Sequence, residues 1–303
     1  MTIDTAPVTQ RPSQTSGPPH CPLCGGTTTP FRAWAWRCDS CDVRFSSLEP
    51  RIETGAAVLL NEDKRAVGLR AVRDRSHAIV LDAIAARRSL AGLAVLDVGS
   101  GHGWFLEAAA ARGFDAVGIE PDRDVAERTR GRGLNVLDGY FPDDLPTADR
   151  FDVIAFNDVF EHLPDPVAAL QAVHERLRPG GILAISIPTA DGLGYRVATT
   201  LARVGIAAPL DRLWQRDLPS PHLWYFTESS LTGLVLDNGF TPLDRGRLPS
   251  VERAGLRERI AVDPRPGVVN KLAFVGVSLA APLLNHARFS DAMWLSFERA
   301  GDA

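Results

Sequence analysis

The chain has 303 residues, of which 45% are hydrophobic and 23% charged, and its formal net charge is −4. These values are ordinary for a globular chain and allow one large domain with a smaller one. The slightly acidic balance provides no global basic field, which makes nucleic acid an unfavoured partner. No stretch reaches the roughly 20 apolar residues of a membrane span, and no signal peptide is recognised. We therefore expect a cytoplasmic protein.

The chain begins with a polar segment rich in Pro, Ser and Thr, and we expect residues 1–19 to form a disordered tail. All four cysteines follow in two C-x-x-C pairs, Cys21 with Cys24 and Cys38 with Cys41. Two such pairs can surround one tetrahedral ion, and thiols stay reduced in a chain without an export signal. The pattern resembles a zinc ribbon over residues 20–48. Four sulfurs leave no position open for a substrate, so the zinc is expected to be structural.

The ribbon is rich in aromatic residues, and we expect Trp34, Trp36 and Phe45 to pack around the metal. A recognition surface is the alternative. Residues 49–92 are charged and have apolar residues at helical spacing, which predicts a helical linker or cap. Its interleaved arginines form either a solvated face or a patch for a phosphorylated substrate.

A strand, a glycine loop, a helix and a second strand follow one another between Leu93 and Asp122. The first apolar run, 94–98, ends in G-S-G-H-G; a helix begins near Trp104; the second run ends on Glu120. The glycines allow a tight turn and close approach of the backbone to a ligand. The helix amides point at that ligand, and an acid after the second strand can accept hydrogen bonds from a ribose diol.

This loop suits a methionine-derived cofactor better than a dinucleotide. The dinucleotide fingerprint is G-x-G-x-x-G, whereas here the third glycine comes one residue early. A carboxylate two residues before the first glycine would repel a pyrophosphate but suits an amino group. The pattern D-x-G-x-G-x-G followed by an acid resembles motif I of the class I S-adenosylmethionine-dependent methyltransferases. The resemblance implies cofactor binding by Asp97, Gly99, Gly101, Gly103 and Glu120.

Strands and helices continue to alternate along the chain. We expect helices at 123–132 and 166–177 and strands at 134–137, 151–156 and 182–187. Alternation of this kind predicts an α/β fold with a doubly wound, mostly parallel sheet. The resemblance implies seven strands in a Rossmann-like methyltransferase domain over residues 93–303, the last of them antiparallel. It also implies that the loop after the third strand lies near the adenine, where Asp138 and Tyr140 are candidates.

The segment from Asn157 to Pro166, N-D-V-F-E-H-L-P-D-P, follows the fourth strand. It resembles a signature of small-molecule and sugar methyltransferases. Asn157 then lies at the carboxyl end of a strand, in the crevice where such sheets bind ligands, and we count it among the cofactor residues. Enzymes that methylate exocyclic amino groups of bases carry an Asp/Asn-Pro-Pro-aromatic motif here, which this chain lacks.

Two inserts interrupt the domain, at residues 189–222 and 246–290. Long inserts in compact domains are usually lids or binding loops, and we interpret the first as a lid over the acceptor. A helix starting after an N-cap at Thr227 follows it. The second insert contains a nearly apolar run, 268–284, which suits a buried helix, a helix at a homodimer interface or a peripheral membrane helix.

Three side chains are candidates for a general base: His222, His162 and Glu161. His222 is placed first because it ends the lid. The favoured function is methyl transfer from S-adenosylmethionine to a small molecule, such as a sugar, a sugar nucleotide or a glycolipid precursor. An RNA methyltransferase with a zinc module and a non-enzymatic zinc-ribbon adaptor are the alternatives.

Overall fold

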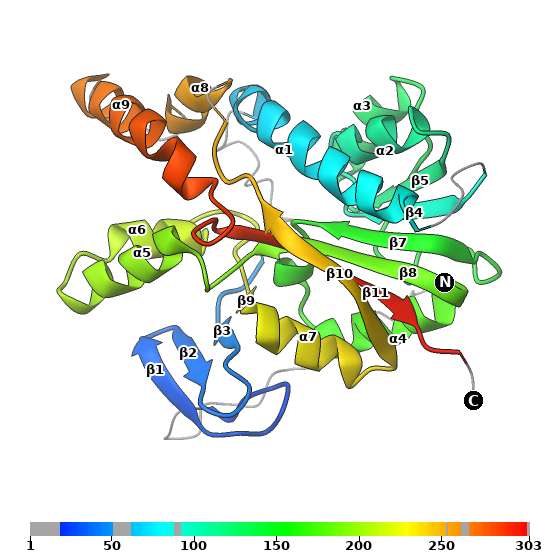
Figure 1. The fold of residues 1–303 in the computed structure, drawn as a ribbon, viewed down its shortest axis with the longest axis horizontal. Coiled ribbons are helices and arrows are strands. Elements are labelled where there is room, and N and C mark those ends of the chain that lie inside the picture. The colour runs from blue at the N-terminus through cyan, green and yellow to red at the C-terminus, as the bar shows by residue number, and fades with distance from the viewer. Residues whose placement is uncertain (1–18, 51–61, 88–91, 253, 262–266, 302–303) are drawn as a thin grey trace, which may run out of the picture.

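A computed structural model describes residues 19–50, 62–87, 92–252, 254–261 and 267–301. The predicted tail at 1–19 lies outside these residues, apart from residue 19. The described chain contains a seven-stranded sheet with helices on both faces and a smaller four-stranded sheet beside it (Figure 1).

The large sheet is mostly parallel, as predicted. Its strands stand in the order β10-β11-β8-β7-β4-β5-β6. Each neighbouring pair among β8, β7, β4, β5 and β6 is parallel. β11 lies antiparallel between β8 and β10, which confirms the expected insertion of the last strand beside the fifth. The strands are β4 (Ala94–Val98), β5 (Asp115–Glu120), β6 (Val136–Asp138), β7 (Phe151–Asn157), β8 (Leu177–Pro188), β10 (Phe240–Leu248) and β11 (Ala292–Arg299).

The position of β7 in the sheet explains why this strand contains an unbroken apolar run. Side chains alternate between the two faces of a strand, and in β7 both faces are covered. Ile154 and Phe156 belong to one hydrophobic core, whereas Val153 and Ala155 belong to the core on the opposite face. A parallel strand covered on both faces needs apolar residues at successive positions. The sequence V-I-A-F at residues 153–156 meets this need.

Helices cover the two faces of this sheet. α1 (Glu62–Ala85), α2 (Trp104–Ala110) and α3 (Arg123–Arg130) lie on one face, and α4 (Pro166–Arg176) and α7 (Glu228–Leu236) on the other (Figure 1). Side-chain caps fix where several of them begin. Asp122 accepts a hydrogen bond from the Val125 amide, and Thr227 forms the predicted N-cap of α7 in a reciprocal capping box with Ser230.

The inserts contribute further helices. The first contains α5 (Leu193–Arg203) and α6 (Ala208–Leu213); the second contains α8 (Leu256–Ala261) and α9 (Gly267–Leu284). β10 runs to Leu248, so the second insert begins after that residue and not at 246. Across the described part of the chain, no helix has the length and apolar character needed to cross a bilayer.

The small sheet is built from two distant parts of the sequence. β1 (Thr28–Arg32), β2 (Ala35–Cys38) and β3 (Arg44–Ser46) come from the ribbon, and β9 (Trp224–Tyr225) follows the lid. Phe45 and Trp36 belong to the hydrophobic cluster that includes Cys21 and Cys38, as expected. Trp34 instead packs edge-on against Trp214 of the first insert, with ring centroids 5.6 Å apart, in a separate hydrophobic cluster. The prediction that Trp34 packs around the metal is therefore wrong.

Candidate functional site

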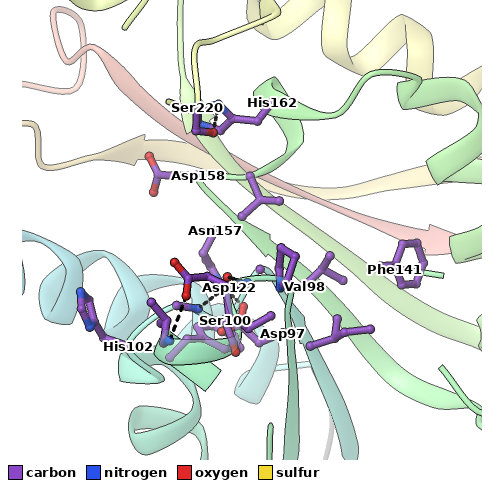
Figure 2. Close-up of a pocket in the computed structure, with 18 of the residues that line it drawn as sticks. Asp97, Val98, Ser100, His102, Asp122, Phe141, Asn157, Asp158, His162 and Ser220 are labelled. Carbon is purple, nitrogen blue, oxygen red and sulfur yellow. Dashed lines mark hydrogen bonds between the residues drawn. The ribbon is translucent and has the colours of Figure 1, made fainter. Parts of the chain in front are cut away.

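A cavity of about 950 Å³ opens at the carboxyl ends of β4, β5 and β7. The glycine loop and Glu120 line one end of it. Figure 2 shows His162 and Ser220 at the other end, away from Asp97 and Asp122, with Asn157 and Asp158 between them. The cavity thus has two ends with different chemistry, which we call the cofactor end and the acceptor end.

The glycine loop shapes the cofactor end. Gly99 has φ +67°, and a Cβ there would lie 2.6 Å from Cγ2 of Val159, so that only glycine fits. Gly101 also lines the cavity. Gly103 does not line it: a Cβ at Gly103 would lie 2.6 Å from side-chain atoms of Leu134 and Thr129. The third glycine therefore serves packing between the loop and its neighbours.

Glu120 is buried and holds the loop. Its Oε2 accepts a hydrogen bond from the Gly101 amide over 2.8 Å, and its Oε1 accepts one from the Asp122 amide over 2.9 Å. Each carboxylate oxygen can accept a second hydrogen bond, and the residue lines the cavity. The carboxylate is thus placed to accept hydrogen bonds from a diol. Burial raises its pKa.

Asp97 lies on β4, next to the strand that carries Glu120, and is also buried. Asn157 Nδ2 donates a hydrogen bond to Asp97 Oδ1 over 2.9 Å. Burial raises the pKa of Asp97 to about 7, although the hydrogen bond from Asn157 acts in the opposite direction. A buried carboxylate without a charged partner favours a cation beside it. A ligand amino group would supply that cation.

The loop after β6 forms the side of the cavity. Gly139, Tyr140 and Phe141 line it, and the Phe141 ring stands edge-on to Phe156 at 5.8 Å. Tyr140 is 46% exposed. Asp138 is not among the lining residues, and its Oδ2 lies 3.5 Å from Nε of Arg123. Of the two candidates in this loop, the structure brings only Tyr140 to the cavity.

The three candidate bases form one cluster at the acceptor end. Glu161 is 1% exposed, and its Oε1 lies 3.9 Å from Nε2 of His162 and 3.9 Å from Nε2 of His222. Burial raises the pKa of Glu161 to about 8. Only His162 lines the cavity; His222 lies behind it, with ring centroids 4.7 Å apart. The structure thus places His162, and not His222, on the cavity wall.

Several residues at the acceptor end could not be recognised from the sequence. Arg73 of α1 lines the cavity and forms an ion pair with Asp158, which follows β7. Gln215, which follows α6, also lines it, and its Nε2 lies 2.8 Å from Nε2 of His222. Arg73 is one of several interleaved arginines and has no distinguishing local signal. Gln215 has no sequence signal at all, because the fold of the first insert brings it to the cavity.

The four cysteine sulfurs lie within 4.8 Å of one another. Sγ of Cys21 and Cys41 are 3.7 Å apart, and Sγ of Cys24 and Cys38 are 3.5 Å apart. A tetrahedral zinc with bonds of about 2.3 Å requires sulfur separations of about 3.8 Å. The amides of Ser40 and Cys41 point at Sγ of Cys38 over 3.4 Å, as in a metal-binding knuckle. This donor set fits zinc.

A family model described as a methyltransferase domain matches residues 70–244, more than half of the chain. Ubiquinone biosynthesis O-methyltransferases from Psychrobacter arcticus and Cereibacter sphaeroides are 31% and 30% identical over 168 and 164 residues. These alignments cover 52% and 51% of this chain, and 63% and 62% of those proteins. The match therefore spans less than two thirds of the relatives' length.

Solved structures share the fold at low sequence identity. The magnesium protoporphyrin IX methyltransferase from Synechocystis PCC 6803 with bound SAH has a TM-score of 0.51 at 14% identity, covering 77% of this chain and 86% of that one. The cyclopropane synthase MmaA2 from Mycobacterium tuberculosis has a TM-score of 0.52 at 17% identity, covering 73% and 82%. The matched domain, the strand order with its antiparallel β11 and the acidic glycine-loop site agree: the chain belongs to the class I S-adenosylmethionine-dependent methyltransferases.

Proposed function

We propose that this chain transfers a methyl group from S-adenosylmethionine to a hydroxyl group of a small molecule. The observation that carries the proposal is the pair of buried carboxylates, Asp97 and Glu120, at the carboxyl ends of adjacent parallel strands in one cavity. At the finer level, we propose an acceptor that is a sugar, a sugar nucleotide or a glycolipid precursor.

Each end of the cofactor has a candidate partner. Asp97 would pair with the amino group, Glu120 would accept hydrogen bonds from the ribose hydroxyls, and Tyr140 and Phe141 would lie against the adenine. When bound, S-adenosylmethionine supplies a methyl group already activated on its sulfonium. The chain must then align the acceptor and remove its proton.

His162 is our candidate for the base. Its Nδ1 lies 2.8 Å from the carbonyl oxygen of Pro221, which can only accept a hydrogen bond. In the neutral ring Nδ1 therefore carries the hydrogen, and Nε2 is left to accept a proton. The carboxyl of Glu161 lies beside Nε2 and would stabilise the resulting imidazolium in its ionised form, which becomes populated as the pH approaches its raised pKa of about 8. Glu161 and His222 then act through His162 as positioning residues.

The size and lining of the cavity support an acceptor bound beside the cofactor. Ligand pockets commonly have volumes of about 300–1,000 Å³, and this cavity lies near the upper limit. Polar groups at the acceptor end suit a polyhydroxylated molecule: Arg73, Asp158, His162, Gln215 and Ser220. A phenol is the second candidate, because the curated relatives are named for ubiquinone biosynthesis.

We also propose that the four cysteines bind a structural zinc. Their sulfurs form a closed set of four, with the spacing that a tetrahedral zinc requires. A closed site leaves no coordination position for a substrate. The zinc therefore takes no direct part in the proposed chemistry.

Calorimetric titration with S-adenosylmethionine and SAH, with NAD beside them, tests the cofactor. Binding of both sulfur compounds without NAD is expected. A panel of sugar nucleotides, lipid-linked sugars and catechols, followed by mass spectrometry for a gain of one methyl group, then tests the acceptor. Methylation of catechols alone would favour the phenol. Failure of both sulfur compounds to bind would favour the adaptor, and salt-dependent RNA binding would favour the RNA enzyme.

A further inference from the structure

The ribbon and the lid share a backbone connection. β3 pairs antiparallel with β9, with Phe45 opposite Trp224. Beyond the paired residues, the Ser46 amide donates to the Leu223 carbonyl over 2.9 Å, and the Ser46 hydroxyl donates to the His222 carbonyl over 3.0 Å. Ser46 is buried, so these hydrogen bonds are shielded from water. The ribbon thus holds the backbone of His222 directly.

A second contact joins the two parts through aromatic rings. Trp214 at the end of α6 is fully buried, and both Trp34 and Phe31 of the ribbon pack against it, at 5.6 and 6.1 Å between centroids. Arg216 of the lid lies over the Trp34 ring at 5.8 Å. Between these two lid residues stands Gln215, in a left-handed conformation with φ +50°. The ribbon thus packs against both neighbours of a residue that lines the cavity.

The residues that follow the lid also bond to the residues after β7. The Leu223 amide donates to the Glu161 carbonyl over 2.9 Å, and Trp224 Nε1 donates to the Leu163 carbonyl over 2.8 Å. Residues 214–224, which include His222, therefore contact both the ribbon and the segment that carries Glu161 and His162.

The cofactor end takes its hydrogen bonds elsewhere. Glu120 holds the amides of Gly101 and Asp122, and Asn157 holds Asp97. These contacts remain within the large sheet and its loops. Loss of order in the ribbon would therefore increase the mobility of the acceptor end before that of the cofactor end.

We infer that the metal-loaded ribbon is the positioning element of the acceptor end: it fixes Gln215 and His222, and metal loss loosens that end while the cofactor end keeps its structure. The inference goes beyond the proposed function but rests on the proposed zinc site. It gives the ribbon a role in shaping the acceptor pocket without any contact between metal and substrate.

Amide hydrogen exchange of the full-length chain, before and after removal of metal with a chelator, tests this inference. Zinc content is followed by atomic emission. We expect exchange in residues 208–226 and 159–163 to accelerate about tenfold without metal and to recover when zinc is returned. Exchange in residues 94–122 and the affinity for SAH should be unchanged. Unchanged exchange at 208–226 would overturn the inference, and so would equal acceleration at 94–122.

A variant separates loss of the contact from loss of the metal. Trp34→Ala removes the ring against Trp214 and leaves all four cysteines, so we expect full zinc content with faster exchange at 208–226. Arg37→Ala is the control, because Arg37 is an exposed ribbon residue that pairs with Asp42 inside the ribbon. Exchange at 208–226 in Trp34→Ala equal to that in Arg37→Ala would also overturn the inference. SAH binding is read separately, so failure of the proposed methyl transfer would be seen independently.

Discussion

Asn157 at the end of β7 donates its side-chain hydrogen bond to Asp97 on the adjacent strand β4, over 2.9 Å. This contact orients a carboxylate that is only 2% exposed and sits in the ligand cavity. An aspartate buried in this way costs folding free energy unless the charge is neutralised. The arrangement is therefore prepared for a cationic group that arrives with a ligand.

Asp97→Ala is expected to weaken binding of SAH by about 1–3 kcal/mol, because a charge-assisted hydrogen bond is lost. Isothermal titration measures the change. Asp115→Ala is the matched control, since Asp115 is exposed and lies at the start of β5, whereas the cavity opens at the carboxyl ends of the strands. Equal affinities in the two variants would contradict the assignment of Asp97 to the amino group.

Binding should also depend on pH in a definite direction. The pKa of Asp97 is raised to about 7, and only the ionised carboxylate can pair with an ammonium group. Affinity for SAH should therefore rise about fivefold from about pH 6 to about pH 7, as the ionised fraction increases. Asp97→Asn should abolish most of this dependence while keeping the shape of the residue. A wild-type affinity that is flat over this range would argue against the pairing.

Gly99→Ala should damage the cofactor end more than an equivalent change elsewhere. Alanine at φ +67° costs about 1–2 kcal/mol, and its Cβ would in addition lie 2.6 Å from Val159. Gly113→Ala is matched to it, because Gly113 has φ +85° but nothing within 4 Å of an added Cβ. Thermal unfolding should show a larger loss for Gly99→Ala, and SAH affinity should fall only in that variant. Similar losses of stability in the two variants would mean that the Val159 side chain moves to accommodate the added Cβ.

His162→Gln should lower the rate of methyl transfer by about 10²–10⁴-fold, the usual contribution of a general base. Affinity for SAH should be preserved, since His162 lies at the acceptor end. Single-turnover kinetics with an acceptor from the screen gives the rate. His222→Gln provides the comparison, with a smaller loss expected because that ring lies behind the cavity wall. A larger loss in His222→Gln would assign the base to His222 instead.

The sequence predicted the large sheet well because its strands carry their own signal. Apolar runs of strand length recur from residue 94 to residue 187 and are followed by Gly99, Glu120, Asn157 and Pro188; β4, β5 and β7 form where those runs stand. The cofactor end followed for the same reason: Asp97, the glycines and Glu120 lie within one continuous segment. Local patterns suffice where a site is built from consecutive residues.

The contacts that assemble the acceptor end could not be predicted in this way, although Glu161, His162 and His222 were candidates from the sequence. β9 has only two residues, and it forms a strand because β3 lies beside it, not because of its own pattern. Likewise, the ring of Trp34 packs against Trp214 at the end of α6, far along the chain. Gln215 lies at the cavity because of a left-handed backbone conformation that its local sequence does not predict. Each of these depends on packing between parts separated by more than a hundred residues, which neither propensity nor periodicity describes.

The hydrogen bond from Ser46 to His222 joins residues 176 positions apart. During synthesis, the small sheet therefore cannot be completed until β9, which lies far along the chain, has been translated. Until residues 222–225 emerge, β3 is an open edge with Phe45 uncovered, and open edges invite pairing with other chains. The small sheet is thus expected among the last parts of the protein to become native, even though three of its four strands precede the large sheet in the sequence.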